Sequence, residues 1–221
     1  MFHPRAFGCI ESRRNAPFGR AFSEPPLPLN PPKILVVAGS IRSGSHNARL
    51  AALMVKELTL IDADVTHLSL GDYPMPIYDG DLEAKSGPPE NALRLKRHFM
   101  GHSGIFIASP EYNASVTPLL KNSIDWVSRV REGSEPPLAA YKNRVFAIGG
   151  ASPGNFAAMR SLITLRQVLE LGCGALVIPE QIAIRDAAHA FDEEDNLKDE
   201  AATRLLKSVA KRLVDVSRAM V

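Results

Sequence analysis

The sequence predicts an α/β fold in which a five-stranded parallel sheet is covered by helices on both faces. Three observations favour it. Short apolar runs recur after residue 33, segments with helical spacing of apolar residues separate them, and the runs are apolar throughout instead of alternating. Continuous apolar strands joined through helices are typical of a doubly wound parallel sheet whose two faces are both buried.

The expected strands cover residues 34–38, 65–70, 105–109, 145–149 and 176–178. Five strands of this kind suggest the flavodoxin-like order, although periodicity alone does not fix which strands are neighbours. In that order a ligand binds in the crevice at the carboxyl ends of the strands.

Four helices are expected from apolar residues at 3.6-residue spacing. Thr117 and Pro118 open the second as N-cap and first-turn proline, and Gly172 is expected to end the third. The apolar positions in chain order are Leu50, Leu53, Met54 and Leu58; Leu120, Ile124 and Val127; Phe156, Met159, Ile163 and Gln167 with Leu162, Leu165 and Leu169 beside them; and Leu205, Val209, Leu213 and Val216.

Length and composition indicate one sizeable domain, over residues 33–221. The chain has 221 residues, of which 45% are hydrophobic, and a net charge of +2, which gives no reason to expect nucleic-acid binding. No apolar stretch approaches the ~20 residues that span a bilayer, so no membrane association is expected. The two cysteines, Cys9 and Cys173, form no disulfide framework, which favours a reducing, cytoplasmic setting.

Residues 1–32 differ from the rest, because arginines outnumber acidic residues and the stretch ends in the proline-rich run SEPPLPLNPP. No apolar core of a secretory signal is present. An arginine-rich transit peptide is an alternative, but the prolines favour an extended, disordered arm, or an incorrectly assigned translation start.

The loop after the first strand reads GSIRSGSHN. Gly39 and Gly44 have the spacing of a P-loop, but Ser45 replaces the lysine that would contact the β- and γ-phosphates, which argues against a nucleoside triphosphatase. The dinucleotide fingerprint G-x-G-x-x-G is also missing, which weakens NAD as a tightly held ligand.

What remains in this loop suits one terminal phosphate at a helix N-terminus. Taken alone, the pattern is equally compatible with a simple helix cap and a solvated arginine, and His46 alone is typical of a surface position. The candidate phosphate-binding groups are the hydroxyls of Ser40, Ser43 and Ser45, the guanidinium of Arg42 and the amide of Asn47.

Two further loops follow the third and fourth strands. Residues 110–113, Pro-Glu-Tyr-Asn, offer an aromatic face and an amide, which suit a flat heteroaromatic ring, although a tyrosine packed at the core margin is the simpler interpretation of that loop alone. Residues 149–156, GGASPGNF, contain G-x-S-x-G. Parallel strands bring all three loops to one sheet edge, where a phosphate cup, an aromatic loop and a glycine-rich loop match the parts of FMN.

The G-x-S-x-G pattern also raises a hydrolase hypothesis, since Ser152 is followed by Asp186 and His189 in the order of a catalytic triad. The residue after the nucleophile must donate a backbone N–H to the oxyanion hole. Here it is Pro153, which has none, so this hypothesis is rejected.

These loops resemble the NADPH-dependent FMN reductase family, which includes quinone, azo and chromate reductases. GSIRSGSHN resembles its phosphate loop, SPEYN with LKNSIDWVSR its flavin-ring loop and following helix, and GGASPG its third flavin loop. The resemblance covers about residues 33–220. A relative that reduces organoarsenicals also carries N-terminal extensions, but its phosphate loop reads differently.

The resemblance implies a set of FMN-binding residues. The FMN phosphate would be held by Ser40, Arg42, Ser45 and Asn47, with His46 in the same loop; the ring and ribityl chain would lie against Pro110, Glu111, Tyr112 and Asn113, with Ser152 and Gly154 near the other side. It also implies a homodimer or homotetramer in which residues 78–83 reach a neighbouring subunit's flavin.

An oligomer is also expected from the segment 71–90, a proline- and glycine-rich loop without a helix of its own. Its five apolar side chains would form an exposed patch on a monomer, and such a patch usually marks an interaction site. The five are Tyr73, Met75, Ile77, Tyr78 and Leu82.

The acidic run 185–200 is expected to be a solvated loop, not a metal site, because its spacing fits no calcium or zinc template. It would supply Asp199 and Glu200 to the start of the last helix.

The predicted function is an FMN-dependent oxidoreductase that uses NADPH or NADH as co-substrate and passes electrons to a small-molecule acceptor. Quinones, free flavins, azo compounds and metal oxyanions are all possible acceptors, and no general acid or base is assigned. Two alternatives stay open: a flavodoxin-type FMN electron carrier without nicotinamide turnover, and a non-catalytic sensor of a phosphate ligand.

Overall fold

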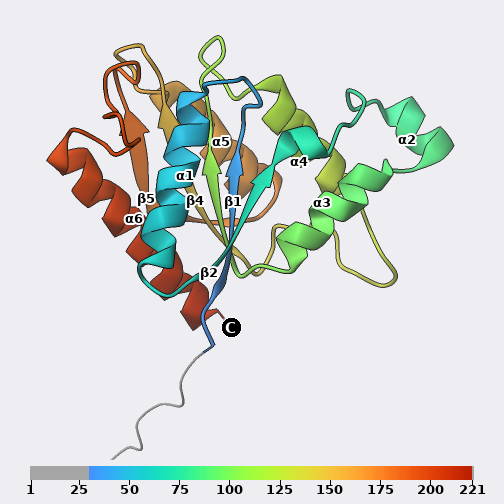
Figure 1. Cartoon of the computed structure of the whole chain (residues 1–221). Coiled ribbons are helices and arrows are strands. Elements are labelled where there is room, and N and C mark those ends of the chain that lie inside the picture. Colours follow the sequence, from blue (N-terminus) through green and yellow to red (C-terminus); the bar gives the residue numbers. More distant parts are fainter. Residues whose placement is uncertain (1–29, 221) are drawn as a thin grey trace, which may run out of the picture.

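The computed structural model describes residues 30–220, so the predicted arm lies almost wholly outside the described residues, as does Val221. It contains a five-stranded, all-parallel sheet in the order β2-β1-β3-β4-β5 (Figure 1), which confirms the predicted fold class. The strands are β1 (Lys33–Ala38), β2 (Asp64–Ser69), β3 (Gly104–Ala108), β4 (Val145–Ala151) and β5 (Leu176–Ile184). The fifth strand is longer than predicted, because it continues beyond residue 178 to Ile184.

Five α-helices and two shorter helical turns connect the strands, and a sixth α-helix follows the last strand. They are α1 (His46–Thr59), η1 (Leu70–Asp72), α2 (Gly80–Ser86), α3 (Glu90–Met100), α4 (Pro118–Arg129), α5 (Met159–Gln167), η2 (Val168–Gly172) and α6 (Glu200–Ala219). Alternate residues of each central strand point to opposite faces. Ile34 and Val36 pack in the core under α1 and α6, whereas Leu35 and Val37 pack in the core under α3, α4 and α5.

Two predicted helix starts, at Thr117 and at Asp199, are confirmed. Thr117 caps α4 with Pro118 in the first turn. Ser45 caps α1 by accepting the N–H of Ala48, which is the simple helix cap that its sequence pattern allowed. Asp199 caps α6 by accepting the N–H of Ala201 at 2.8 Å. A side-chain oxygen at this position satisfies an amide that has no partner within the helix.

The predicted apolar stripe of the third helix is wrong. Phe156 precedes α5, and Met159 and Ile163 lie on its exposed face; Leu162 and Leu165 are the buried residues. This segment is apolar on two sides, so spacing alone does not identify the face that meets the sheet. Leu205 of α6 is likewise exposed, and its neighbour Leu206 is buried instead.

The helical segment ends at Gly172, as predicted, but its last turn is the π-helical turn η2. The left-handed glycine expected at Gly172 is Gly174, with φ of 65°. The next turn buries Cys173, and burial raises the pKa of its thiol to about 11; Cys9 lies outside the described residues.

The segment 71–90 contains a helix, contrary to the prediction. Asp79 caps α2 by accepting the N–H groups of Asp81 and Leu82. Of the five apolar side chains, Tyr73 is buried, three pack partly buried against the protein, and only Ile77 is largely exposed, at 75%. The predicted apolar patch of this loop is therefore absent from the described surface.

Within residues 30–220, no helix combines the length and the apolar content needed to cross a membrane.

Candidate functional site

The loops after β1, β3 and β4 meet at the carboxyl edge of the sheet, as predicted. Hydrogen bonds from two side chains connect these loops. Thr117 Oγ1, at the start of α4, donates to the Gly39 carbonyl at 2.7 Å. The Asn47 amide donates to the Ala151 carbonyl at 2.8 Å and accepts the Ala151 N–H at 2.9 Å.

The first loop forms a turn that leads into the N-terminus of α1. The first turn of α1 has no acidic residue, so the positive end of the helix dipole is not neutralised there. Among the described residues, the backbone N–H groups of Ser43, Gly44 and His46 have no hydrogen-bond partner. Arg42 is exposed beside them. Free amides, hydroxyls and one guanidinium fit a phosphate group.

The environments of Asn47 and His46 differ from those expected from the sequence, where Asn47 was a phosphate ligand and His46 a surface residue. Both polar ends of the buried Asn47 amide are engaged by Ala151, so this side chain holds the first loop to the end of β4. His46 is partly buried, and its Nδ1 atom has no partner within the described chain. Burial lowers the pKa of His46, and the positive charges of Arg42 and Arg49 lower it further, so the imidazole is neutral at pH 7.

The second loop forms a two-residue hairpin. Tyr112 and Ser115 exchange both backbone hydrogen bonds at 3.0 Å, and the turn residues Asn113 and Ala114 have φ values of 49° and 63°. Left-handed conformations at both positions are typical of a type I′ turn. The Tyr112 side chain stands at the base of this hairpin and is 48% exposed.

A cavity of about 360 Å³ joins the first two loops. Its size lies in the range of small-molecule sites. The lining residues are Gly39, Ser40, Ile41 and Arg42 from the first loop, and Tyr112, Thr117, Pro118 and Leu119 from the second loop and α4. The structure thus brings Ser40, Arg42 and Tyr112 together. A Cβ atom at Gly39 would lie 3.1 Å from Leu120 and 3.3 Å from Pro110, so a larger residue here would have to displace these side chains.

Pro110 and Glu111 fasten the second loop to α5. The Pro110 carbonyl accepts a hydrogen bond from Ser161 Oγ at 2.8 Å. The Glu111 carboxylate, with a side chain only 6% exposed, pairs with Arg160 and accepts the backbone N–H groups of Arg160 and Ser161. This carboxylate is therefore engaged by the helix and is not free for a ligand.

Ser152 and Gly154 lie in the third loop and do not line the 360 Å³ cavity. Ser152 Oγ accepts the N–H of Gly154 at 3.2 Å, and the Ser152 N–H donates to the Ile184 carbonyl. His189 pairs with Asp186 on the exposed surface, and among the described residues it makes no hydrogen bond to Ser152. The geometry therefore assembles no triad from these three side chains.

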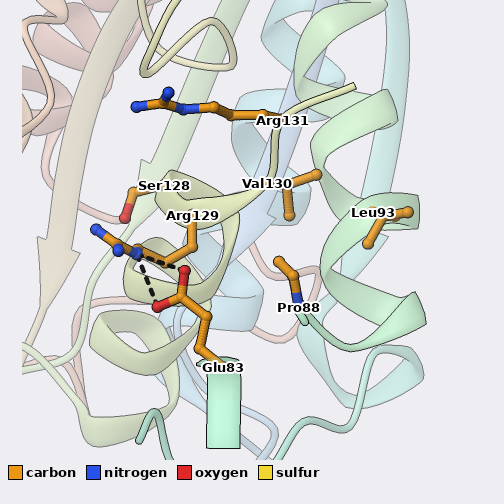
Figure 2. Close-up of a pocket in the computed structure, with 7 residues that line it drawn as sticks. All are labelled: Glu83, Pro88, Leu93, Ser128, Arg129, Val130 and Arg131. Carbon is orange, nitrogen blue, oxygen red and sulfur yellow. Dashed lines mark hydrogen bonds and ion pairs between the residues drawn. The ribbon is translucent and has the colours of Figure 1, made fainter. Parts of the chain in front are cut away.

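A larger cavity, of about 580 Å³, lies at the other end of α4. Figure 2 shows its seven lining residues, with both carboxylate oxygens of Glu83 bonded to Arg129 Nε at 2.9 Å. Pro118 and Arg129 are separated by about 16 Å of helix. This cavity is consequently remote from the three loops. In residues 30–220, no three His, Cys, Asp or Glu side chains are grouped to hold a metal ion.

Sequence reasoning missed Ser161 and Arg160 and took Thr117 only as a helix cap. Arg160 and Ser161 lie 49 and 50 residues from Glu111. No local pattern signals such pairs. A positive residue in the first turn of α5, where the helix dipole disfavours it, is the one unusual feature of the sequence there.

The sequence model of NADPH-dependent FMN reductases matches residues 32–189, which include all three loops. The NAD(P)H-dependent FMN reductase PA1204 of Pseudomonas aeruginosa is 34% identical over 183 residues, covering 82% of this chain and 92% of that protein. An Escherichia coli quinone reductase is 33% identical over 138 residues, covering 62% and 69% of the two chains.

The fold comparison agrees with the sequence comparison. The solved structure of a flavoenzyme NAD(P)H:(acceptor) oxidoreductase from Paracoccus denitrificans aligns with a TM-score of 0.68 at 26% identity, over 86% of this chain and 98% of that one. Because the matched segment carries both the sheet and the three loops at its carboxyl edge, this protein belongs to the NADPH-dependent FMN reductase family.

Proposed function

We propose that the protein is an FMN-dependent oxidoreductase that transfers hydride from NADPH or NADH, through bound FMN, to a small-molecule acceptor. The observation that carries this function is the cavity that joins Ser40 and Arg42, at the N-terminus of α1, to the exposed ring of Tyr112. When bound, the flavin supplies the two-electron chemistry, and the protein supplies binding and orientation.

The first loop would hold the FMN phosphate. Arg42 supplies a mobile positive charge, Ser40 and Ser45 supply hydroxyls, and the three unpartnered N–H groups supply fixed donors. A neutral His46 beside them adds a hydrogen-bonding nitrogen without adding charge. Asn47 contributes indirectly, through the Ala151 backbone.

The second and third loops would hold the ring. Tyr112 and Asn113 offer an aromatic surface and an amide, while Ser152 and Gly154 offer small polar groups on the β4 side. Quinones are the acceptor class that we favour, since several relatives at 30–33% identity are named quinone reductases. Free flavins, azo compounds and metal oxyanions are the other candidates.

Steady-state oxidation of NADPH and NADH, with and without a quinone, tests this function against a flavodoxin-type carrier. A reductase turns over the nicotinamide many times per flavin, whereas a carrier does not. A purified protein that stays colourless after incubation with FMN would support the sensor alternative instead.

The phosphate assignment predicts that Arg42→Ala combined with Ser45→Ala weakens FMN binding at least about tenfold, because each charge-assisted hydrogen bond contributes roughly 1.5–3 kcal/mol. Fluorescence titration with FMN measures the change. The control is Arg204→Ala with Ser208→Ala, which removes the same two side chains from the exposed face of α6. Equal affinity in both double variants would refute the assignment.

We also propose a homodimer, or a tetramer built from it, assembled through the exposed face of α5 and not through residues 78–83. Met159 and Ile163 are 38% and 62% exposed on that face, and Phe156, just before the helix, is 64% exposed. A two-fold axis would bury two copies of this apolar surface against each other. We further propose a cytoplasmic location and a single FMN-binding domain from residue 33, with residues 1–32 outside it.

A further inference from the structure

Arg160, in the first turn of α5, joins the second loop to the exposed face of the helix. Its Nε atom donates to Glu111 Oε1 at 2.8 Å, and Nη2 contacts the same carboxylate. On its other side, the guanidinium carbon lies 4.4 Å from the centre of the Phe156 ring. Glu111 is almost buried, whereas Arg160 is half exposed, so the pair is shielded mainly on the loop side.

Glu111 also serves as the N-terminal cap of α5. The chain enters this helix through Ala157 and Ala158, both in left-handed conformations, and Ala158 provides no side-chain cap. The acceptor for the first amides comes from Glu111 Oε2, at 3.1 Å from the N–H of Arg160 and 3.4 Å from that of Ser161. A carboxylate at a helix N-terminus is favoured by both the free amides and the dipole.

The hydroxyl of Ser161 completes the attachment. It donates to the Pro110 carbonyl at 2.8 Å and lies 2.8 Å from Ser109 Oγ. Beyond Glu111, the hairpin 112–115 makes hydrogen bonds only within itself, as far as residues 30–220 show. The position of Tyr112 over the cavity is set on one side where Pro110 and Glu111 meet α5, and on the other side where Thr117 meets the Gly39 carbonyl.

We propose that Arg160 is a positioning residue for the FMN site: by pairing with Glu111 it holds the hairpin that carries Tyr112 over the cavity of the phosphate loop. This inference rests on the proposed function. Arg160 does not line the cavity and acts on the ligand through the second loop. Without the Arg160 side chain, the Glu111 carboxylate still accepts the backbone N–H groups of α5, but it loses the positive charge that holds it in place.

FMN titration of four proteins tests this: wild type, Arg160→Ala, Glu111→Gln, and the double variant. We expect each single variant to bind FMN about tenfold more weakly than wild type. The double variant should bind no more weakly than the worse single one, because the effects of substituting the two members of one ion pair are not additive. Arg160→Lys should recover part of the affinity. Glu111→Gln keeps an acceptor oxygen for the α5 amides, so it carries the test even if Arg160→Ala does not fold.

The control is Arg204→Ala, which removes an exposed helical arginine paired with Glu200 and should leave FMN affinity unchanged. The visible circular dichroism of bound FMN reports the surroundings of the ring, and we expect it to change in Arg160→Ala but not in the control. A wild-type protein that does not bind FMN would overturn the proposed function and this inference together. Wild-type binding with unchanged affinity in both single variants, or with additive losses, would overturn the positioning role alone.

Discussion

The partly buried His102 joins the end of α3 to β2. Its Nδ1 donates to the His98 carbonyl at 2.6 Å, and its Nε2 lies 2.9 Å from Thr66 Oγ1. Burial lowers the pKa of His102, and Lys33 lowers it further, whereas the hydrogen bond to the His98 carbonyl and the carboxylate of Asp64 act in the opposite direction. The imidazole is therefore neutral in the folded protein at pH 7.

This lowered pKa predicts a loss of stability on mild acidification. As the pH falls below about 6.5, the usual pKa of histidine, the unfolded chain binds a proton at this position before the folded protein does. The free energy of unfolding must then decrease with falling pH until the folded-state pKa is passed. His102→Asn should lose less stability than wild type between pH 7.5 and 5.5, measured by urea unfolding.

His189→Asn, at an exposed position on the acidic loop, is the control for this prediction. Its pH dependence should follow that of wild type. If wild type and His102→Asn lose equal stability over this interval, the linkage assigned to His102 is wrong.

Individual site residues show what one sequence can and cannot reveal. Thr117 and Pro118 before an apolar stripe predict the cap of α4, because that bond is formed within one turn. Asn47 and Glu111 were placed in the right loops, but their partners are 104 and 49 residues away. Tertiary packing decides which distant residue a polar side chain contacts, and the local sequence does not predict that partner.

Among the elements, α3 is fastened to the loop after α4 by Lys96. This side chain is fully buried and pairs with Glu132 and Glu135, whose side chains are 35% and 28% exposed. Arg97, next to it on the exposed side of α3, pairs with Glu132 at 2.7 Å. Ala92, Leu95 and Phe99 complete the buried face. A lysine within an apolar stripe conceals the period, which is why α3 is not among the predicted helices.

The two sides of this ion-pair cluster should respond differently to substitution. Glu132→Gln with Glu135→Gln leaves the buried ammonium of Lys96 without a carboxylate, and we expect a clear loss in the free energy of unfolding. Lys96→Met should cost less, because the two partly exposed carboxylates can be hydrated. Chemical denaturation at pH 7 measures both changes.

Glu193→Gln with Glu194→Gln, on the exposed acidic loop, removes the same charge and should change stability little. A greater loss in Lys96→Met than in the double glutamine variant would contradict the assigned asymmetry.

For the whole molecule, fold class and site location follow from simple patterns. Continuous apolar runs separated by helices predicted the parallel sheet, and parallel strands necessarily bring the loops after β1, β3 and β4 to one edge. The side of α5 that meets the sheet did not follow, because two of its faces are apolar. The sheet buries Leu162 and Leu165, and the other face is left as surface.

That surface predicts the assembly state. Ile163→Glu places a charge at the centre of the proposed subunit contact and should yield a monomer, because burying an unpaired carboxylate is strongly unfavourable. Light scattering on the FMN-loaded protein at micromolar concentration measures the mass. Leu60→Glu, at a residue 68% exposed next to the end of α1, is the matched control and should keep the wild-type mass. A fully active wild-type monomer would remove this role from α5.

The double hydrogen bond between Asn47 and Ala151 has a consequence for the thermodynamics of ligand binding. The chain gives up the conformational entropy of the first and third loops when it folds, because the Asn47 amide already fixes one against the other. A ligand at this edge of the sheet therefore meets a largely rigid frame, and little of its binding free energy is spent on ordering these two loops.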